Sequence, residues 1–307
     1  MIYSPLRYPG SKRRVMNELL PMFPDGIKDW REPFMGSLSV TLAFIQSQKA
    51  IDCERIVAAD LNPEIYAFWE GVKRDPQEVH QIQYEWVTKG IPSLSEYREA
   101  LKELGEEDKE VQRLDEILIS ESRDFWKELQ SVDCSTLGLS KRAARLYLVN
   151  KLSFSGMGDS GSLGLYQTRK FVPEKGVELE SVSKVIQNVY FVNKPFQETV
   201  KDVTKDTFIF FDPPYYAQEG AGLYGRNGDL HKGFPHKEFG NVANGLKCNW
   251  LITYDDSPFV RRMFRGKYIN TLYIRYSCSY THAEDSLDGE ELLISNYDIN
   301  GDLVYDL

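Results

Sequence analysis

The stretch "FIFFDPPYYA", residues 208–217, runs from four apolar residues into an aspartate, two prolines and two tyrosines. A short continuous apolar run is typical of a strand that is covered on both faces of a sheet. In open α/β sheets, ligands bind beyond the carboxyl ends of such strands. Asp212 and the residues after it are therefore the first candidates for a functional site.

The residue types of this segment favour an amino group as the ligand. Asp212 and the backbone carbonyls of Pro213 and Pro214 accept hydrogen bonds, and the proline rings hold the backbone rigidly. Tyr215 offers an aromatic face on which a planar ring stacks. Acceptors beside a flat surface match the exocyclic amine of a nucleobase, which is reached only after the base is flipped out of a duplex.

Strands and helices alternate in the first part of the chain. The sequence from Asp29 predicts a strand, a turn at Gly36 and a helix, and residues 55–60 predict a second strand before a helix that begins at Pro63. This order is typical of a parallel sheet. Apolar runs predict further strands at 189–193, 207–212, 250–256, 268–276 and 291–298, the late ones antiparallel.

A segment of different composition and periodicity separates these strand-rich parts. Charged segments with helical periodicity predict helices at 76–88, 94–104, 107–131 and 140–149. A Gly/Ser-rich stretch at 153–170 then predicts a loop or an irregular hairpin. The fold class is therefore α/β, interrupted by a mainly helical insertion.

Composition limits the kind of protein. The net charge is −9, yet residues 141–170 hold six bases and one acid, Asp159, so a basic patch exists on an acidic molecule. The four cysteines form no CxxC pair and there are only four histidines, which argues against a zinc site. No apolar run approaches the ~20 residues of a membrane helix, and the N-terminus has no signal-like apolar core, so we expect an intracellular protein.

Two further segments predict a ligand site beside Asp212. Gly36 lies between a strand and a helix, where backbone amides hold polar ligands, and Asp60 ends the next strand, where nucleotide folds bind ribose hydroxyls. In "RYPGSKRR", residues 7–14, Lys12 begins a helix and is suited to bind a carboxylate.

In combination, these segments resemble the Dam-like family of DNA adenine-N6 methyltransferases. The similarity covers most of the chain except residues 75–140. It is carried, in the family's order, by "YPGSK" (8–12), "EPFMGSLSV" (32–40), "DLN" (60–62), "YLVNKLSFSG" (147–156), "DPPY" (212–215) and "ELLISNYD" (291–298).

The resemblance implies S-adenosylmethionine as cofactor and double-stranded DNA with a flipped adenine as partner, with no metal and no membrane. It implies a Rossmann-like catalytic domain of residues 1–74 and 188–307, a helical target-recognition insertion of residues 75–187 with a hairpin or loop near 150–172, and a cytoplasmic enzyme of a prokaryote or phage. The implied catalytic residues are Asp212, Pro213, Pro214 and Tyr215. The implied donor contacts are Tyr8, Pro9, Gly10, Ser11, Lys12, Glu32, Pro33, Phe34, Gly36, Ser37, Asp60, Leu61, Asn62 and Asp212. The candidate nucleic-acid contacts are Arg142, Arg145, Asn150, Lys151, Ser155, Arg169 and Lys170.

Several alternatives stay open at this point. Cytosine-C5 methylation is excluded because no cysteine follows a proline. Cytosine-N4 and RNA adenine methylation use the same amine chemistry. Leu38 stands where the family has a second donor-loop glycine, which raises the possibility of a nucleic-acid-binding homologue with an impaired donor site. The glycine-rich residues 217–236 are expected to close over the flipped base.

Overall fold

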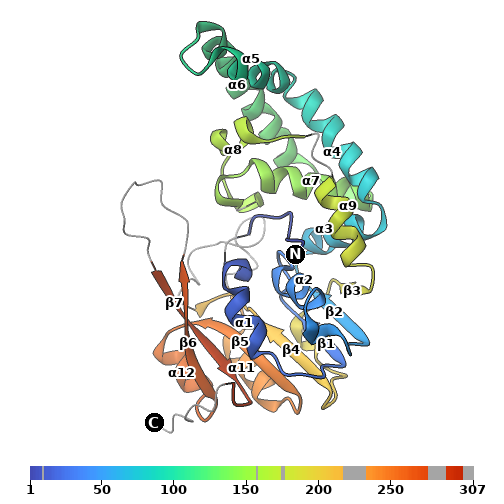
Figure 1. Ribbon diagram of the computed structural model, residues 1–307, viewed down its shortest axis with the longest axis vertical. Helices are drawn as coiled ribbons and strands as arrows, with labels where there is room; N and C mark the ends of the chain where they lie inside the picture. Colours follow the sequence, from blue (N-terminus) through green and yellow to red (C-terminus); the bar gives the residue numbers. More distant parts are fainter. Residues whose placement is uncertain (9, 157, 174–176, 217–232, 276–287, 300–307) are drawn as a thin grey trace. The chain divides into compact units, whose positions relative to one another are not determined.

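A computed structural model of the 307-residue chain describes all residues except 9, 157, 174–176, 217–232, 276–287 and 300–307. The chain divides into two compact units (Figure 1). The first contains residues 1–4, 10–66 and 185–307, and the second contains residues 5–9 and 67–184. The second unit is therefore inserted into the chain of the first.

The first unit is built on a seven-stranded sheet with the order β3-β2-β1-β4-β5-β7-β6. The five strands from β3 to β5 pair in parallel, and β7 pairs antiparallel with both β5 and β6. This mixed sheet with its helices confirms the predicted α/β class. The strands are β1 (Asp29–Glu32), β2 (Arg55–Ala59), β3 (Val189–Val192), β4 (Thr207–Phe211), β5 (Asn249–Asp255), β6 (Tyr268–Arg275) and β7 (Asp288–Ser295).

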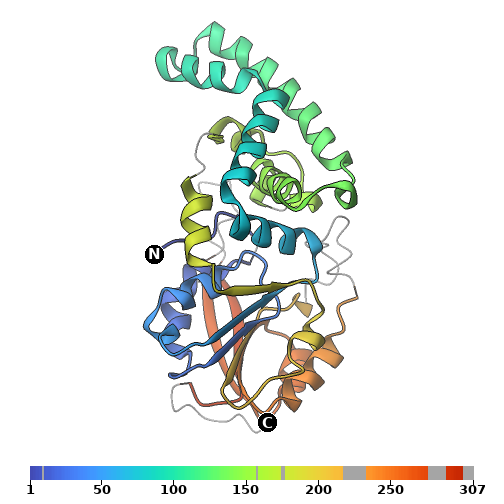
Figure 2. The same cartoon turned by 90° about the vertical axis from the view of Figure 1, so that its right-hand side faces the viewer.

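Helices cover both faces of this sheet, as the side-on view shows (Figure 2). On β4, Phe208 and Phe210 have ring centroids 5.3 and 6.1 Å from that of Phe23, after α1. Ile209 and Phe211 instead join a cluster with residues of α10, α11 and α12. Because successive side chains of a strand point to opposite faces, β4 is buried on both sides, as its apolar run predicts. The helices of this unit are η1 (Lys12–Val15), α1 (Met16–Met22), α2 (Ser39–Ile45), η2 (Gln48–Ala50), α10 (Phe196–Thr199), α11 (His236–Gly245) and α12 (Pro258–Met263).

The centre of the sheet contains a topological switch point. From β1 the chain continues to β2, which lies on one side, whereas β4 leads to β5 on the other side. Doubly wound sheets bind ligands in the crevice beyond the carboxyl ends of the two strands at such a point. The turn with Gly36 follows β1 and Asp212 directly follows β4. The two candidate segments are therefore at the same edge of the sheet.

The second unit is mainly helical, and the four helices predicted in it are confirmed to within a few residues. Within it, α4 packs against α7, and α5 packs against α6. Helix α3 (Pro63–Arg74) begins in the first unit and ends in the second, and α9 (Val177–Val185) does the reverse. The other helices are α4 (Pro76–Gly90), α5 (Ser93–Leu104), α6 (Lys109–Ser131), η3 (Cys134–Thr136), α7 (Leu139–Leu152), η4 (Phe154–Gly156), η5 (Gly158–Ser160) and α8 (Leu165–Lys170).

Some details differ from the sequence-based expectations. The helical unit begins at residue 67 instead of 75, because the second half of α3 packs within it: the rings of Phe68 and Tyr147 stack with centroids 6.3 Å apart. The hairpin expected near 150–172 is replaced by η4, η5 and α8, with a single β-bridge between Ser153 and Leu163. Helices α10, α11 and α12 are additional to those predicted.

Candidate active site

Asp212 lies in a network of hydrogen bonds at the carboxyl end of β4. Lys12 Nζ is 2.7 Å from both of its carboxylate oxygens. Thr253 on β5 donates its hydroxyl to Asp212 Oδ1 over 2.7 Å. The Asp212 side chain is 24% exposed, so the carboxylate is oriented by the protein while one part of it stays accessible to a ligand.

Lys12 is a buried cation with a side chain that is only 1% exposed. Its Nζ also donates to the Gly10 carbonyl over 2.9 Å and lies 3.6 Å from Glu291 Oε2. Burial alone would lower the pKa of Lys12, but the charges and hydrogen bonds of Asp212 and Glu291 outweigh it, and the pKa is raised. Lys12 therefore stays protonated and holds two carboxylates together.

Tyr215 is held by contacts at its hydroxyl and its ring. The hydroxyl donates to Glu291 Oε2 over 2.5 Å and lies 3.3 Å from Asp212 Oδ1. Since a phenol has one proton, the shorter contact takes it. The ring stacks on Tyr254 with a centroid distance of 5.9 Å, and Lys12 Nζ lies 5.3 Å from its centroid. The ring is half-buried, so part of it is open to a ligand.

The turn after β1 and the end of β2 are tied together through Asp60. Gly36 N donates to Asp60 Oδ2 over 3.0 Å, and Asn62 N donates to Asp60 Oδ1 over 2.8 Å. Asn62 in turn accepts a hydrogen bond from Glu64 N at the start of α3. Burial raises the pKa of Asp60 to about 6, and the two amide hydrogen bonds oppose that rise. Asp60 is therefore mostly ionised at neutral pH, and both of its oxygens accept hydrogen bonds.

Leu38 has a backbone conformation that glycine adopts more readily than leucine does. Its φ is 56° and its ψ is 18°, in the left-handed region, at the N-cap of α2. Its side chain has no exposed surface. A residue that lined an open ligand site would retain exposure, so Leu38 points into the protein core. The concern that its side chain crowds a ligand is therefore not supported by the structure.

Two of the expected donor contacts instead support the turn from within. Glu32 is 3% exposed, and its carboxylate accepts from the backbone N, over 3.0 Å, and from the hydroxyl of Thr41 in α2. Burial raises the pKa of Glu32 to about 8. The ring of Phe34 packs 5.7 Å from that of Phe196 and 5.9 Å from that of Phe239. Both side chains therefore support the turn through their contacts with neighbouring helices.

The other residues expected to contact the methyl donor differ in burial and position. Ser37 is buried with its hydroxyl 3.4 Å from that of Ser11, and Pro33 is also buried. Leu61 is 54% exposed. Tyr8 belongs to the second unit, and Pro9 lies outside the described residues.

Arg145 and Asn150, expected to contact nucleic acid, are structural residues of the second unit. Arg145 has no exposed surface; it donates to the Leu129 carbonyl over 2.7 Å and to both carboxylate oxygens of Asp159 over 2.6 and 3.1 Å. Asn150 is 4% exposed and exchanges hydrogen bonds with the backbone N and O of Arg7 over 2.9 and 2.5 Å. Neither side chain is available to a phosphate, which corrects the expectation for both.

The remaining basic candidates differ in availability. Arg169 donates two bonds of 2.6 Å to Asp115, and Lys151 pairs with Glu178 over 3.1 Å. Lys170 is exposed, with its Nζ 5.2 Å from the ring centroid of Tyr166, and Arg142 is half-exposed. The Ser155 side chain and residues 217–232, most of the expected closing loop, lie outside what the structure describes.

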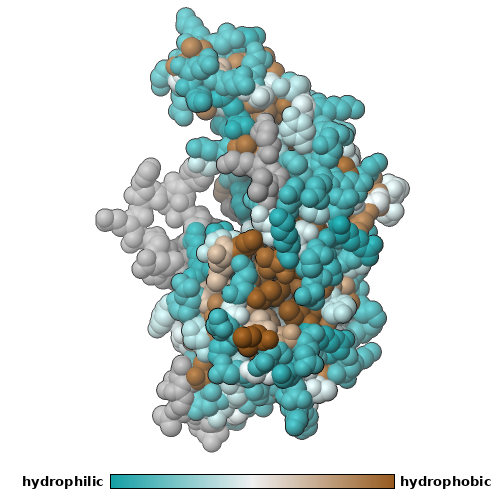
Figure 3. Space-filling view, turned by 45° about the vertical axis from the view of Figure 1, so that its right-hand side comes forward, coloured by the Kyte–Doolittle hydropathy of each residue, from teal (hydrophilic) through white to brown (hydrophobic). Residues whose placement is uncertain are grey.

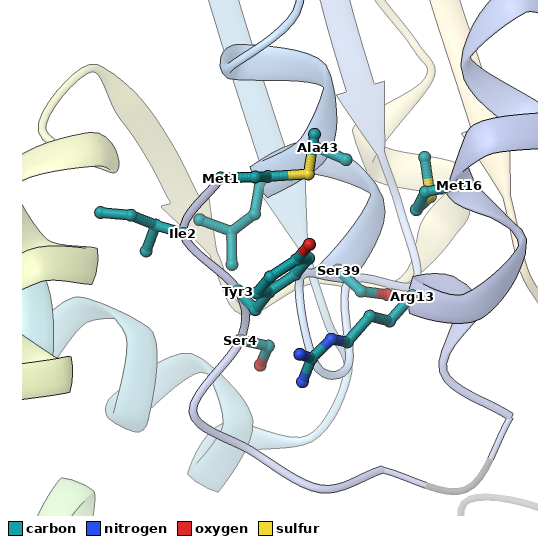
Figure 4. Close-up of a pocket in the computed structure, with 9 residues that line it drawn as sticks. Met1, Ile2, Tyr3, Ser4, Arg13, Met16, Ser39 and Ala43 are labelled. Atoms are coloured by element: carbon teal, nitrogen blue, oxygen red, sulfur yellow. The ribbon is translucent and has the colours of Figure 1, made fainter.

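A recess between the N-terminal segment and α2 is not a second candidate for the donor. It is lined by residues that include Met1, Met16 and Ala43, and the Arg13 guanidinium lies 3.9 Å from the Tyr3 ring centroid (Figure 4). Its inner space of about 10 Å³ holds one water molecule at most. Hydrophobic residues gather on the face of the molecule drawn in Figure 3, but an apolar surface alone offers no polar anchor.

The described residues contain neither a metal-ligand cluster nor a membrane-spanning helix. No three His, Cys, Asp or Glu side chains there are grouped as a metal site would require. None of the described helices has the length and hydrophobicity of a membrane span.

Sequence reasoning missed Thr253 and Glu291. Thr253 lies on β5, which pairs with β4, and the register Asp255↔Glu291 brings Glu291 on β7 to the same edge. The available signal was an acid directly before the apolar residues Leu292 and Leu293 of a predicted strand. A charged residue in such a position is buried only when it is paired.

Comparison with known proteins identifies the family of the chain. The profile of the family described as D12 class N6 adenine-specific DNA methyltransferase matches residues 8–277. A Type II methyltransferase, M.MjaIII, of Methanocaldococcus jannaschii is 25% identical over 68% of each chain. DNA adenine methylases of Haemophilus influenzae and Vibrio cholerae are 24% and 22% identical, over 89% and 87% of this chain and 87% and 86% of their own. A methyltransferase of this class implies S-adenosylmethionine as methyl donor and DNA as substrate. The chain belongs to the D12 class of N6 adenine-specific DNA methyltransferases and is an enzyme of DNA adenine methylation.

Proposed function

We propose that Asp212 and Tyr215 receive an adenine flipped out of double-stranded DNA and that its N6 nitrogen is methylated there. The observation that carries this proposal is the position of Asp212: it follows β4 at the switch point, is oriented by Lys12 and Thr253, and is still 24% exposed. An acceptor fixed beside a half-exposed aromatic ring suits an amine on a planar base.

Asp212 has a free acceptor position for the amine. Among the described residues, Oδ1 accepts from Thr253 and Lys12, whereas Oδ2 accepts from Lys12 alone. A carboxylate oxygen accepts two hydrogen bonds, so Oδ2 can take one from N6. This bond directs the nitrogen lone pair and stabilises the positive charge that develops on nitrogen. After the new C–N bond forms, N6 loses one proton, which the exposed side of Asp212 can pass to water.

The residues after β1 and β2 suit the donor. S-adenosylmethionine supplies an electrophilic methyl group on a sulfonium, which leaves as a neutral thioether. Asp60 is an ionised acceptor for its ribose hydroxyls, next to the Gly36 turn. Lys12 is assigned a different role from a donor contact: it orients Asp212, because its Nζ is bonded to that carboxylate and to the Gly10 carbonyl.

The second unit is the proposed DNA-reading part of the enzyme. Of the basic candidates, Lys170 is exposed and Arg142 half-exposed, and these two are the proposed phosphate contacts. Phosphate contacts of this kind set affinity and register without reading sequence.

The test compares Asp212→Ala with Asp206→Ala, an exposed aspartate just before the other end of β4. Methyl transfer to duplex DNA, with nucleosides identified by mass spectrometry, should give N6-methyladenine with the unchanged protein and with Asp206→Ala. Asp212→Ala should lose roughly a hundredfold or more in rate, the cost of removing one oriented polar group at a reacting centre. Full activity of Asp212→Ala, or N4-methylcytosine as product, would contradict the proposal, as would a preference for matched duplex RNA.

A further inference from the structure

We propose that Glu291 is a positioning residue for methyl transfer, which fixes the Tyr215 ring through its hydroxyl and shares Lys12 with Asp212. The inference rests on the proposed function, because it takes Tyr215 as the wall that the base contacts. It goes further by assigning a role to a strand residue outside the catalytic segment.

Glu291 is nearly enclosed, and its polar contacts with Tyr215 and Lys12 lead to the active site. Its side chain is 2% exposed, its Oε2 accepts the Tyr215 hydroxyl over 2.5 Å, and the same oxygen lies 3.6 Å from Lys12 Nζ. Burying a carboxylate costs several kcal/mol unless it is paired and hydrogen-bonded. A strand that needed only packing at this position would be served better by an apolar side chain.

The fold places Glu291 there through the antiparallel return of β7. Glu291 pairs with Asp255 at the carboxyl end of β5, and its neighbour Glu290 pairs with Tyr273 on β6. Side chains alternate along a strand, so Glu291 is buried while Glu290 is exposed. The two adjacent glutamates therefore form a matched pair for experiment.

The charge balance explains why a carboxylate is needed. One buried ammonium, Lys12, faces two carboxylates, Asp212 and Glu291. Lys12 Nζ lies 2.7 Å from both Asp212 oxygens and 3.6 Å from Glu291 Oε2, so the one ammonium compensates the charge of both carboxylates. A hydrogen bond to an ionised acceptor is also about twice as strong as one between neutral groups, which restrains the Tyr215 ring.

The hydroxyl bond to Glu291 matters because it acts at the far end of the Tyr215 side chain. Stacking on Tyr254, with ring centroids 5.9 Å apart, restrains the plane of the Tyr215 ring. The hydroxyl bond to Glu291 anchors the far end of the side chain and so limits its swing about the Cα–Cβ bond relative to Asp212. Small misplacements of a reacting group reduce rate strongly, so this bond should act on the methyl-transfer step.

The test is a double-mutant cycle with Glu291→Gln, Tyr215→Phe and the double variant, with Glu290→Gln as the control. Two quantities are measured: the single-turnover methylation rate, and the fluorescence of 2-aminopurine placed at the target adenine. Each single substitution should lower the methylation rate by roughly tenfold. The double variant should be no slower than the slower of the two single variants. Glu290→Gln should match the unchanged protein. The 2-aminopurine signal of a flipped base should fall in the single variants and not in the control.

Two outcomes would overturn the proposal. Multiplicative losses in the double variant would show two independent effects, as a purely structural Glu291 would give. Unchanged rates in either single variant would remove the positioning role. If Glu291→Gln does not fold, Tyr215→Phe alone decides, because wild-type rate and fluorescence in that variant exclude a functional hydroxyl bond. Asp212→Ala, run in parallel, separates the two ideas: an active Asp212→Ala ends the proposed function, whereas an inactive one with an additive cycle ends only this inference.

Discussion

Leu38 allows the backbone strain at the donor turn to be measured. Among the described residues, it is the one non-glycine residue with a positive φ, at 56°. A Cβ in the left-handed region costs roughly 1–2 kcal/mol, and glycine avoids this cost. Leu42, one turn later in α2, is 1% exposed and has an ordinary helical position. The two leucines are therefore comparable in burial and differ in backbone conformation.

Glycine and alanine substitutions at both positions isolate the strain. Removing either buried leucine side chain should cost about 3–5 kcal/mol of unfolding free energy. At Leu42, glycine should be less stable than alanine by about 1 kcal/mol, as in other helix interiors. At Leu38, relief of the left-handed strain should offset that deficit by roughly 1–2 kcal/mol, so that Leu38→Gly equals or exceeds Leu38→Ala in stability.

Urea unfolding followed by circular dichroism gives all four free energies. An equal glycine deficit at both positions would refute the strain argument. Because the Leu38 side chain is fully buried, a folded Leu38→Gly variant should also bind S-adenosylmethionine with unchanged affinity by calorimetry. A gain of tenfold or more, about 1.4 kcal/mol, would mean that Leu38 does obstruct the donor.

The remaining predictions concern Asp60 and the second unit. Since the pKa of Asp60 is raised to about 6 by burial, against the amide bonds of Asn62 and Gly36, donor affinity should fall as pH drops through 6, and Asp60→Asn should show weak, pH-independent binding by calorimetry. The folded state holds this proton more tightly than the unfolded state, so the same group lowers stability as pH rises from about 4 to 6. Arg145→Ala should lose roughly 3–5 kcal/mol of unfolding free energy, because it leaves the Asp159 carboxylate without its buried partner. Lys170→Ala should instead leave stability unchanged and weaken DNA binding, with a salt dependence smaller by about one unit in anisotropy titrations.

The parts of the fold that depend on local sequence were predictable. The apolar run before Asp212 gave a buried strand because both faces of β4 are covered by helices. Helices of the second unit followed from periodicity over long segments, where many residues contribute to one pattern. The turn at Gly36 and the acid Asp60 were also predictable, since each lies within a strand–turn–helix unit whose geometry is local.

What depended on distant pairing was not predictable. Arg145 lies in a basic stretch of sequence and was therefore expected to contact phosphate. In the fold it pairs inside the second unit with Asp159, the one acid of that stretch. Glu291 reaches Tyr215 only because β7 returns antiparallel beside β5, and no residue near either position in sequence reports that register. The charge of a residue is read from the sequence, whereas its partner is set by the fold.

The two tyrosines after Pro213-Pro214 also have the same residue type but different partners in the fold. Tyr215 points its hydroxyl to Glu291 and leaves part of its ring open. The Tyr216 backbone N donates to Asp255 Oδ1 over 2.6 Å, and its ring stacks on Phe259 with centroids 4.3 Å apart at 16°. That spacing admits no base between the rings, since a stacked base would need about the same distance from each of them. Tyr216 therefore fastens residues 212–216 to β5 and α12, which is why we propose Tyr215 and not Tyr216 as the aromatic wall of the site.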